Sequence, residues 1–170
     1  FAILIYFLQK INSRVIFNFI ILGYLSFFSL ATVKYNFIWS SPVKFYKRII
    51  NLSPNSFTAY NNLAVLYLNQ GNFQEAQELL MKSLEINPQF LEARLNLARY
   101  YYLKQDYSRA IGLAKGVLEK DPNNFLAWDL LGEVYLKKRE YALAEGCYKK
   151  AVDLNPGYIP LWLDLYSFYK

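Results

Sequence analysis

The sequence predicts an all-α protein in which a solenoid of stacked helix pairs follows a membrane-spanning helix. The first observation is a proline that recurs every 34 residues, at Pro54, Pro88, Pro122 and Pro156, because a fixed period of this length indicates repeated helix pairs. The second is the stretch of residues 15–33, which carries no charged side chain. The third is the composition, 55% hydrophobic and 19% charged, which is more apolar than that of an ordinary soluble protein.

Residues 1–40 are expected to form a membrane segment. As a helix, the uncharged stretch 15–33 would extend over about 28 Å at ~1.5 Å per residue, which matches a hydrocarbon core of about 30 Å. Tyr35, Phe37 and Trp39 follow at the depth where aromatic rings prefer the membrane interface. A signal peptide is the alternative, but no Ala-x-Ala-like cleavage site follows the stretch.

Two further features of this segment concern neighbours in the bilayer. Residues 1–8 are apolar but too short to cross alone. Because the sequence does not begin with methionine, we expect a fragment and interpret residues 1–8 as the end of an earlier span. Small residues recur at every third position of the main span and predict a strip where a neighbouring transmembrane helix could pack. They are Gly23, Ser26, Ser29 and Thr32.

The positive charge of the chain is confined to its first third. The net charge is +6, and residues 57–170 carry equal numbers of basic and acidic side chains, so residues 1–56 hold the whole excess. These bases border an apolar stretch and do not form a groove that could follow phosphates, so nucleic acid is excluded as a partner. More of them follow the predicted span than precede it, which favours a cytoplasmic repeat domain.

The residue types that most enzymes need are missing. The chain has no histidine and one cysteine, Cys147, which excludes Ser-His-Asp triads, histidine metal sites and thiolate-clustered zinc. Cys147 falls in a predicted helix of the third repeat, and we interpret it as a buried structural thiol. We therefore expect a protein that is not an enzyme, with no catalytic residue, metal or cofactor.

The repeats are residues 57–90, 91–124 and 125–158. In each, positions four, seven, eight and eleven fall on one face of a first helix, and positions twenty, twenty-four and twenty-seven on one face of a second. Position twenty is always alanine: Ala76, Ala110 and Ala144. Small residues there and at position eight would let the paired helices approach closely. This pattern resembles the tetratricopeptide repeat (TPR) family, which implies helix-turn-helix units stacked in a right-handed superhelix.

The repeat pattern continues at both ends. Residues 41–56 are predicted to be a half-repeat with a helix at 43–52, and residues 159–170 the first helix of a further repeat or a cap. Over residues 43–170 we expect seven helices, with 159–170 fraying. Gly71 suits a left-handed turn between paired helices, whereas Gln105 and Arg139 at the same position predict turns that are less relaxed or differently shaped.

The resemblance to TPR proteins also implies where a partner binds. It places positions two, five, six, nine and twelve of each first helix on a concave wall, where asparagine amides could pair with a peptide backbone. Arg99 could meet a carboxylate or be held by acids of the next repeat. The candidate binding residues are Asn61, Asn62, Val65, Asn96, Arg99, Tyr102, Asp129 and Glu133.

The leading functional hypothesis is a membrane-tethered scaffold that binds a protein or peptide segment in this concave groove, with the lipid bilayer as its second partner. The alternative comes from residues 1–60, which resemble the end of multi-span glycosyltransferases that transfer lipid-linked sugars to protein. In that case the repeats would be the C-terminal tail of a membrane enzyme.

Overall fold

The computed structural model describes residues 18–29, 32 and 41–170. The chain divides into two compact units, Phe1–Phe45 and Tyr46–Lys170. The helix α3 (Pro42–Leu52) begins in the first unit and ends in the second. Each unit is described by itself.

In the first unit, residues 18–29 are helical and their side chains are exposed. Hydroxyl groups of the predicted small-residue strip bond to nearby backbone carbonyls: Ser26 Oγ donates to the Gly23 carbonyl at 2.9 Å and Thr32 Oγ1 to the Phe28 carbonyl at 2.7 Å. Within the described residues, we find no helix both long and apolar enough to span a membrane. The remainder of the predicted span, and the predicted earlier span 1–8, lie outside those residues.

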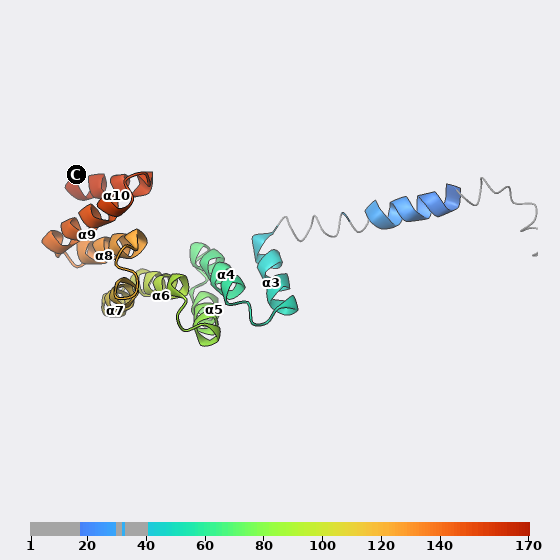
Figure 1. Ribbon diagram of the computed structural model, residues 1–170, viewed down its shortest axis with the longest axis horizontal. Coiled ribbons are helices and arrows are strands. Elements are labelled where there is room, and N and C mark those ends of the chain that lie inside the picture. The colour runs from blue at the N-terminus through green and yellow to red at the C-terminus, as the bar shows by residue number, and fades with distance from the viewer. Residues whose placement is uncertain (1–17, 30–31, 33–40) are drawn as a thin grey trace, which may run out of the picture. The chain divides into compact units, whose positions relative to one another are not determined.

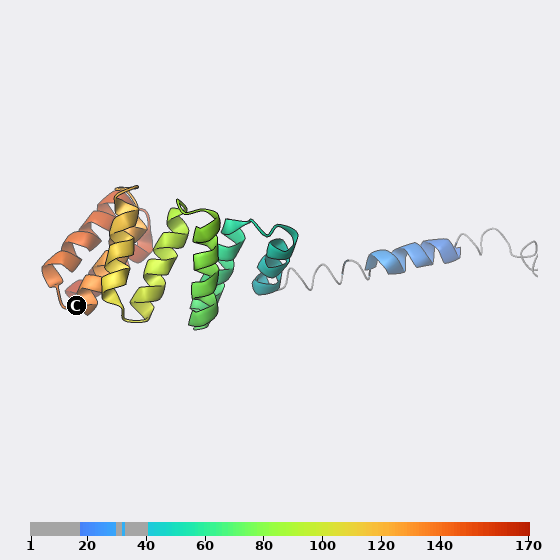
Figure 2. The same cartoon turned by 90° about the horizontal axis from the view of Figure 1, so that it is seen from below.

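The second unit is a row of helices with no strand among its residues (Figures 1 and 2). After α3 the helices are α4 (Phe57–Asn69), α5 (Phe73–Ile86), α6 (Leu91–Leu103), α7 (Tyr107–Leu118), α8 (Phe125–Lys137), α9 (Tyr141–Leu154) and α10 (Ile159–Tyr169). Each predicted repeat contains one helix pair: α4 with α5, α6 with α7, and α8 with α9. The all-α helix-turn-helix fold is thus confirmed, but the prediction of seven helices was wrong, because α10 is formed and packs on α9.

The core of each pair is built where small residues meet large ones. Ala76, Ala110 and Ala144 at position twenty have no exposed surface. Position eight holds Ala64, Ala98 and Gly132, and position twenty-four of the same repeats holds Leu80, Ala114 and Tyr148. In the third repeat the larger Tyr148 ring lies directly over Gly132, where a Cβ atom would be 2.7 Å from the Tyr148 Cδ1 atom. A glycine at position eight therefore makes room for the tyrosine.

The turns inside the three repeats share one conformation. Gly71, Gln105 and Arg139 have φ angles of 77°, 60° and 64°, all in the left-handed region. In each turn the next residue's N–H donates to the carbonyl of the tyrosine at position eleven, at 2.9 Å. The turns are therefore not differently shaped. The strain of a left-handed backbone is instead carried by side-chain-bearing residues in the second and third repeats.

The links between repeats share a hydrogen bond that the repeat pattern did not predict. The side chain at position four donates to the carbonyl of the proline six residues before it. Arg94 Nη2 bonds to Pro88 at 2.9 Å, and Trp128 Nε1 to Pro122 at 3.0 Å. Trp162 Nε1 repeats the bond with Pro156 at 2.9 Å. These bonds fix α6, α8 and α10 to the links that precede them.

Candidate functional site: the inner wall of the solenoid

The first helices of the repeats form the inner wall of the second unit. In Figure 1, α4, α6, α8 and α10 lie along the inner side of a curve, while α5, α7 and α9 lie along its outer side. Consecutive first helices touch, since α4 contacts α6 and α6 contacts α8. The predicted binding residues lie on three of these helices: Asn61, Asn62 and Val65 on α4, Asn96, Arg99 and Tyr102 on α6, and Asp129 and Glu133 on α8.

A chain of side-chain amides crosses the wall near its amino-terminal end. Asn96 Nδ2 donates to Asn61 Oδ1 at 2.8 Å, and Asn61 Nδ2 donates to Asn62 Oδ1 at 3.2 Å. Asn62 Nδ2 reaches Tyr46 Oη on α3 at 3.4 Å. Asn61 is 5% exposed, so its amide holds α4 and α6 together and cannot face a ligand fully. On α6, the amide predicted to pair with a ligand is that of Asn96. Its orientation is set by the bond to Asn61 and not by Asn62.

The middle of the wall contains an acidic cavity. A cavity of about 70 Å³ lies between α6 and α8. It is lined by Leu95, Asn96, Arg99, Leu126, Asp129, Leu130 and Glu133. Four of the eight predicted residues therefore lie together at this cavity: Asn96, Arg99, Asp129 and Glu133. The other four lie outside it: Asn61, Asn62, Val65 and Tyr102.

The carboxylates of the cavity are incompletely paired. Asp129 Oδ1 and Glu133 Oε2 are both buried, and neither has a hydrogen-bond partner among the described residues. Arg99 Nη2 approaches the other carboxylate oxygen, Glu133 Oε1, at 3.9 Å, and its side chain is 58% exposed. A contact this long and this exposed contributes little stability. Arg99 therefore only partly compensates the two acids.

Burial and like charge raise the pKa values of these acids. The pKa of Asp129 rises to about 7, first because the carboxylate is desolvated and then because Asp164 and Glu133 lie nearby. Burial also raises the pKa of Glu133, and Arg99 opposes that rise. Asp164, on α10, has its pKa raised by burial and lowered by Arg99. Near neutral pH the wall thus holds three carboxyl groups around a single guanidinium, one of them partly protonated.

The sequence reasoning missed Asp164 as a wall residue. It occupies position six of the partial fourth repeat, the position of Asn62 and Asn96, so the repeat register contained the signal. Tyr102 lies next to the acids, since burial and the Glu133 carboxylate both raise its pKa. Its ring centroid is 6.3 Å from that of Tyr107.

Comparison with known proteins supports the repeat assignment. Three family models described as tetratricopeptide repeat match residues 45–78, 70–134 and 125–158, which together cover more than half of the chain. No curated protein matches the chain.

Among solved structures, the crystal structure of MamA is 23% identical, with a TM-score of 0.61 over 75% of this chain and 74% of that one. MamA residues 41 to the end from Desulfovibrio magneticus RS-1 are 21% identical, with a TM-score of 0.61 over 74% and 71%. Likeness at this identity shows the fold alone. With the family models, it establishes that this chain belongs to the tetratricopeptide repeat family.

Proposed function

We propose that this protein is a membrane-tethered TPR scaffold that binds an extended or helical segment of another protein along α4, α6 and α8. The observation that carries the proposal is the cavity between α6 and α8, where two buried carboxylate oxygens have no hydrogen-bond partner among the described residues. A buried polar atom without a partner costs free energy, which a donor on a ligand would recover. The groove therefore favours a segment that carries arginine or lysine.

The chemistry of the surrounding wall supports a peptide ligand. Leu95, Leu126 and Leu130 offer apolar contacts beside the acids, and Asn96 offers an amide that can pair with a peptide backbone. Arg99 is largely exposed and can swing toward the solvent when a ligand cation replaces it. Such a mixture of apolar contact and a few directed polar groups is typical of peptide-binding grooves.

The proposed tether is the uncharged stretch 15–33, which would hold the groove near the bilayer and raise its local concentration. We further propose that the repeats lie on the cytoplasmic side, because the basic residues after the stretch outnumber those before it. Carbonate extraction of the expressed chain should leave it in the membrane pellet, and release into the supernatant would refute the tether. Protease protection in sealed vesicles tests the side.

The groove is tested by selecting ten-residue peptides from a randomised display library against the purified chain. Enrichment of arginine or lysine is expected, and the enrichment should disappear with the double variant Asp129→Asn and Glu133→Gln. A matched control is Asp153→Asn, which removes an exposed charge from α9 and should leave the selection unchanged. Selection of acidic or purely apolar peptides would contradict the proposed ligand class.

A second pair of variants separates the groove from the exposed end of the solenoid. Asn96→Ala with Tyr102→Ala should weaken binding of a selected peptide while the helical circular dichroism signal stays near that of the wild type. The melting midpoint should fall modestly, because Asn61 loses the bond from Asn96, so binding is measured well below that midpoint. If binding instead survives this change and is lost with Trp162→Ala and Tyr166→Ala on α10, the peptide binds at the end and the groove assignment is wrong.

A further inference from the structure

The outer side of the solenoid carries an apolar hollow that plays no part in the groove. It has a volume of about 430 Å³ and lies where α7, α8 and α9 meet. Its walls are Leu118, Trp128, Leu131, Tyr135, Leu143 and Cys147. The charged residues at this hollow are Lys115 and Glu119, both exposed and both from the last turn of α7 and its cap. A volume of this size is typical of small-ligand sites, which run from roughly 300 to 1,000 Å³.

Four lining residues of the hollow differ from their counterparts one repeat earlier, and two of these differences bear on its floor and wall. At position twenty-three the first two repeats have Leu79 and Leu113, whereas the third has the smaller Cys147. At position nineteen the second repeat has Arg109, whereas the third has Leu143. Compared with the second repeat, the third therefore has a smaller side chain at the floor of the hollow, Cys147. At the wall it has an apolar side chain, Leu143, in place of an arginine.

The same three-helix junction one repeat earlier shows the contrast. There Arg109 lies over the Tyr101 ring, with its guanidinium carbon 4.5 Å from the ring centroid. Arg109 also donates to the Tyr101 hydroxyl at 3.2 Å. A neighbouring depression of the second repeat is lined by polar side chains, among them Gln77, Lys104 and Asp106, and shares with the counterparts of the hollow only Tyr101 and Arg109. At the positions equivalent to the hollow, the second repeat has Leu113 and the charged Arg109 where the third has Cys147 and Leu143, so the third repeat offers an apolar ligand more room and no charge at these two positions.

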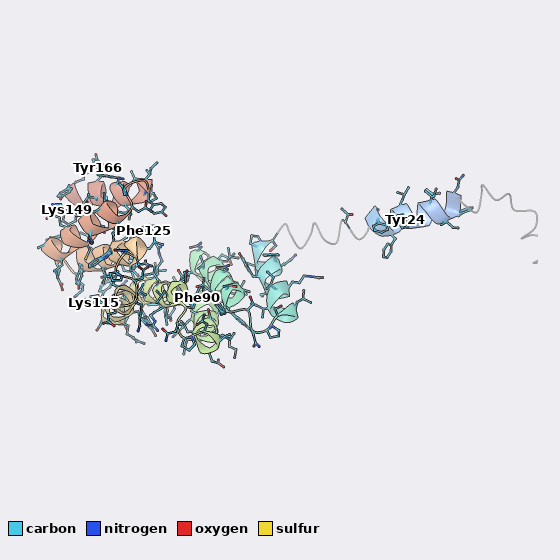
Figure 3. The ribbon with its side chains drawn as sticks, viewed as in Figure 1. Tyr24, Phe90, Lys115, Phe125, Lys149 and Tyr166 are labelled. Atoms are coloured by element: carbon cyan, nitrogen blue, oxygen red, sulfur yellow. The ribbon has the colours of Figure 1, made fainter. Side chains whose placement is uncertain are left out.

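The walls of the hollow are held in place, and its floor is uncharged. Trp128 is fixed by the bond from Nε1 to the Pro122 carbonyl, 3.0 Å long. Leu131 and Tyr135 are 2% and 8% exposed, so both are anchored in the core. Burial raises the pKa of the Cys147 thiol to about 11, so the sulfur stays protonated at neutral pH and suits an apolar neighbour. Lys115, which Figure 3 labels on the outer side of the curve, lies at the rim and is the charged group that lowers the pKa of this thiol.

We infer that this hollow binds a fatty acid, with the acyl chain against Trp128, Leu143 and Cys147 and the carboxylate beside the Lys115 ammonium. The apolar walls accept the methylene groups, and Lys115 supplies the one complementary charge. Glu119, one helical turn beyond Lys115, repels an anionic head group. The carboxylate of the fatty acid therefore cannot lie at that end of the hollow. This inference depends on neither the groove nor the tether.

Equilibrium dialysis of radiolabelled laurate against the full chain, held in amphipol to avoid free detergent, tests the inference. Saturable binding of one laurate per chain is expected. Cys147→Leu, which restores the residue of the first two repeats, should weaken binding at least tenfold. Cys147→Ala keeps the hollow open and serves as the matched control, with binding retained. Equal binding by the wild type and Cys147→Leu, or no saturable binding to the wild type, overturns the inference.

The two ends of the ligand can be tested separately. Lengthening the acid from octanoate to laurate should tighten binding about fourfold for each added CH₂. Lys115→Gln should weaken laurate several-fold and leave dodecanol unchanged, while Glu119→Gln should tighten laurate. If dodecanol and laurate respond alike to both changes, the hollow does not recognise a carboxylate.

The reactivity of Cys147 offers a test that does not require the Cys147→Leu variant to fold. Cys147 is the single cysteine of the chain, so its reaction with a maleimide, followed at pH 9 where more of the thiol is ionised, reports on this hollow alone. Laurate should slow that reaction at least tenfold, with a midpoint that agrees with the dialysis. A maleimide rate that laurate leaves unchanged places the fatty acid elsewhere and overturns the inference.

Discussion

The second and third repeats have the same backbone conformation but differ in the side chains that fill their cores and cover their outer surfaces. Both have a fully buried alanine at position twenty and a left-handed turn residue with a side chain. Where the second repeat pairs Ala98 with Ala114, the third pairs Gly132 with Tyr148. The outer surface differs too, with Arg109 stacked on Tyr101 in one repeat and an open apolar hollow in the other. Close helix contact and turn geometry therefore define the repeat, while the remaining positions are free to acquire chemistry.

The largest effect is expected from breaking what the two repeats share. Ala110→Trp places a large ring at a position with no exposed surface, between α6 and α7. Overpacking of this kind costs ~1–3 kcal/mol or more, and the upper part of that range is expected here. Urea unfolding measures it. Ser108→Trp on the exposed face of α7 is the control and should change little. An unchanged unfolding midpoint for Ala110→Trp would show that the repeat register is wrong.

Gly132→Ala tests the feature that is particular to the third repeat. The new Cβ would lie 2.7 Å from two atoms of the Tyr148 ring, which is 3% exposed and cannot move aside. Alanine gains ~1 kcal/mol of helix propensity over glycine. The clash should outweigh that gain and leave a net loss of about 2 kcal/mol.

The same clash predicts a rescue. Tyr148→Leu recreates the pairing of Ala64 with Leu80 in the first repeat, so Gly132→Ala should become neutral or stabilising in that background. A double-mutant cycle measures the coupling between the two positions. Additive effects of the two substitutions would show that Gly132 is not needed to admit the tyrosine.

The acidic wall makes stability depend on pH. The folded-state pKa of Asp129, about 7, lies above the ordinary value of 3.8. Because the folded state holds this proton more tightly, the stabilisation is fully present below pH 4 and is lost as pH rises to about 7. Its size should be on the order of 1 kcal/mol once partial exposure is allowed for. Melting midpoints across pH 4–8 measure the slope.

Asp129→Asn should reduce that slope, because it removes the carboxyl whose pKa is raised to about 7 and keeps the side chain's shape; Glu133 and Asp164, whose pKa values are also raised, should account for the remaining slope. Asp153→Asn on the outer helix α9 should leave the slope unaltered. A slope as steep in Asp129→Asn as in the wild type would assign the pH dependence to other groups.

The smallest effects concern the shared turn. Gln105→Gly and Arg139→Gly relieve a left-handed backbone that costs a residue with a Cβ about 1–2 kcal/mol. Part of that gain is offset by the flexibility of glycine in the unfolded state, so each should stabilise by about 0.5 kcal/mol. Gly71→Ala should destabilise by a similar or larger amount, since nothing crowds the site and only its φ angle matters. Gln70→Gly, beside it at φ −90°, should only destabilise. Loss of stability in Gln105→Gly would contradict the assigned conformation.

The sequence predicted the helix pairs well because the repeat spaces its prolines, alanines and tyrosines regularly. It could not predict the turn conformation at Gln105 and Arg139, since there the carbonyl of the position-eleven tyrosine captures the next N–H and imposes a left-handed residue of any type. The sequence also could not predict the bond from position four to the preceding proline carbonyl, because two unlike side chains, Arg94 and Trp128, make it.

The candidate site was predicted in part. Repeat positions brought Asn96, Arg99, Asp129 and Glu133 to one wall, and the structure places them around one cavity. The pairing of Asn96 with Asn61, and the unpaired oxygens of the two acids, depend on how α6 packs between α4 and α8. No spacing rule contains that information. Asp164 was missed because the partial fourth repeat was considered only as an apolar end.

Photo-crosslinking of a selected peptide tests the central claim, that the inner wall carries the binding. The peptide bears a benzoylphenylalanine next to its arginine or lysine, and mass spectrometry identifies the attached residues. We expect crosslinks to α6 and α8 around Leu95, Leu126 and Leu130, and we expect excess unlabelled peptide to abolish them. Crosslinks confined to α10 or to the outer helices α5, α7 and α9 would contradict the claim.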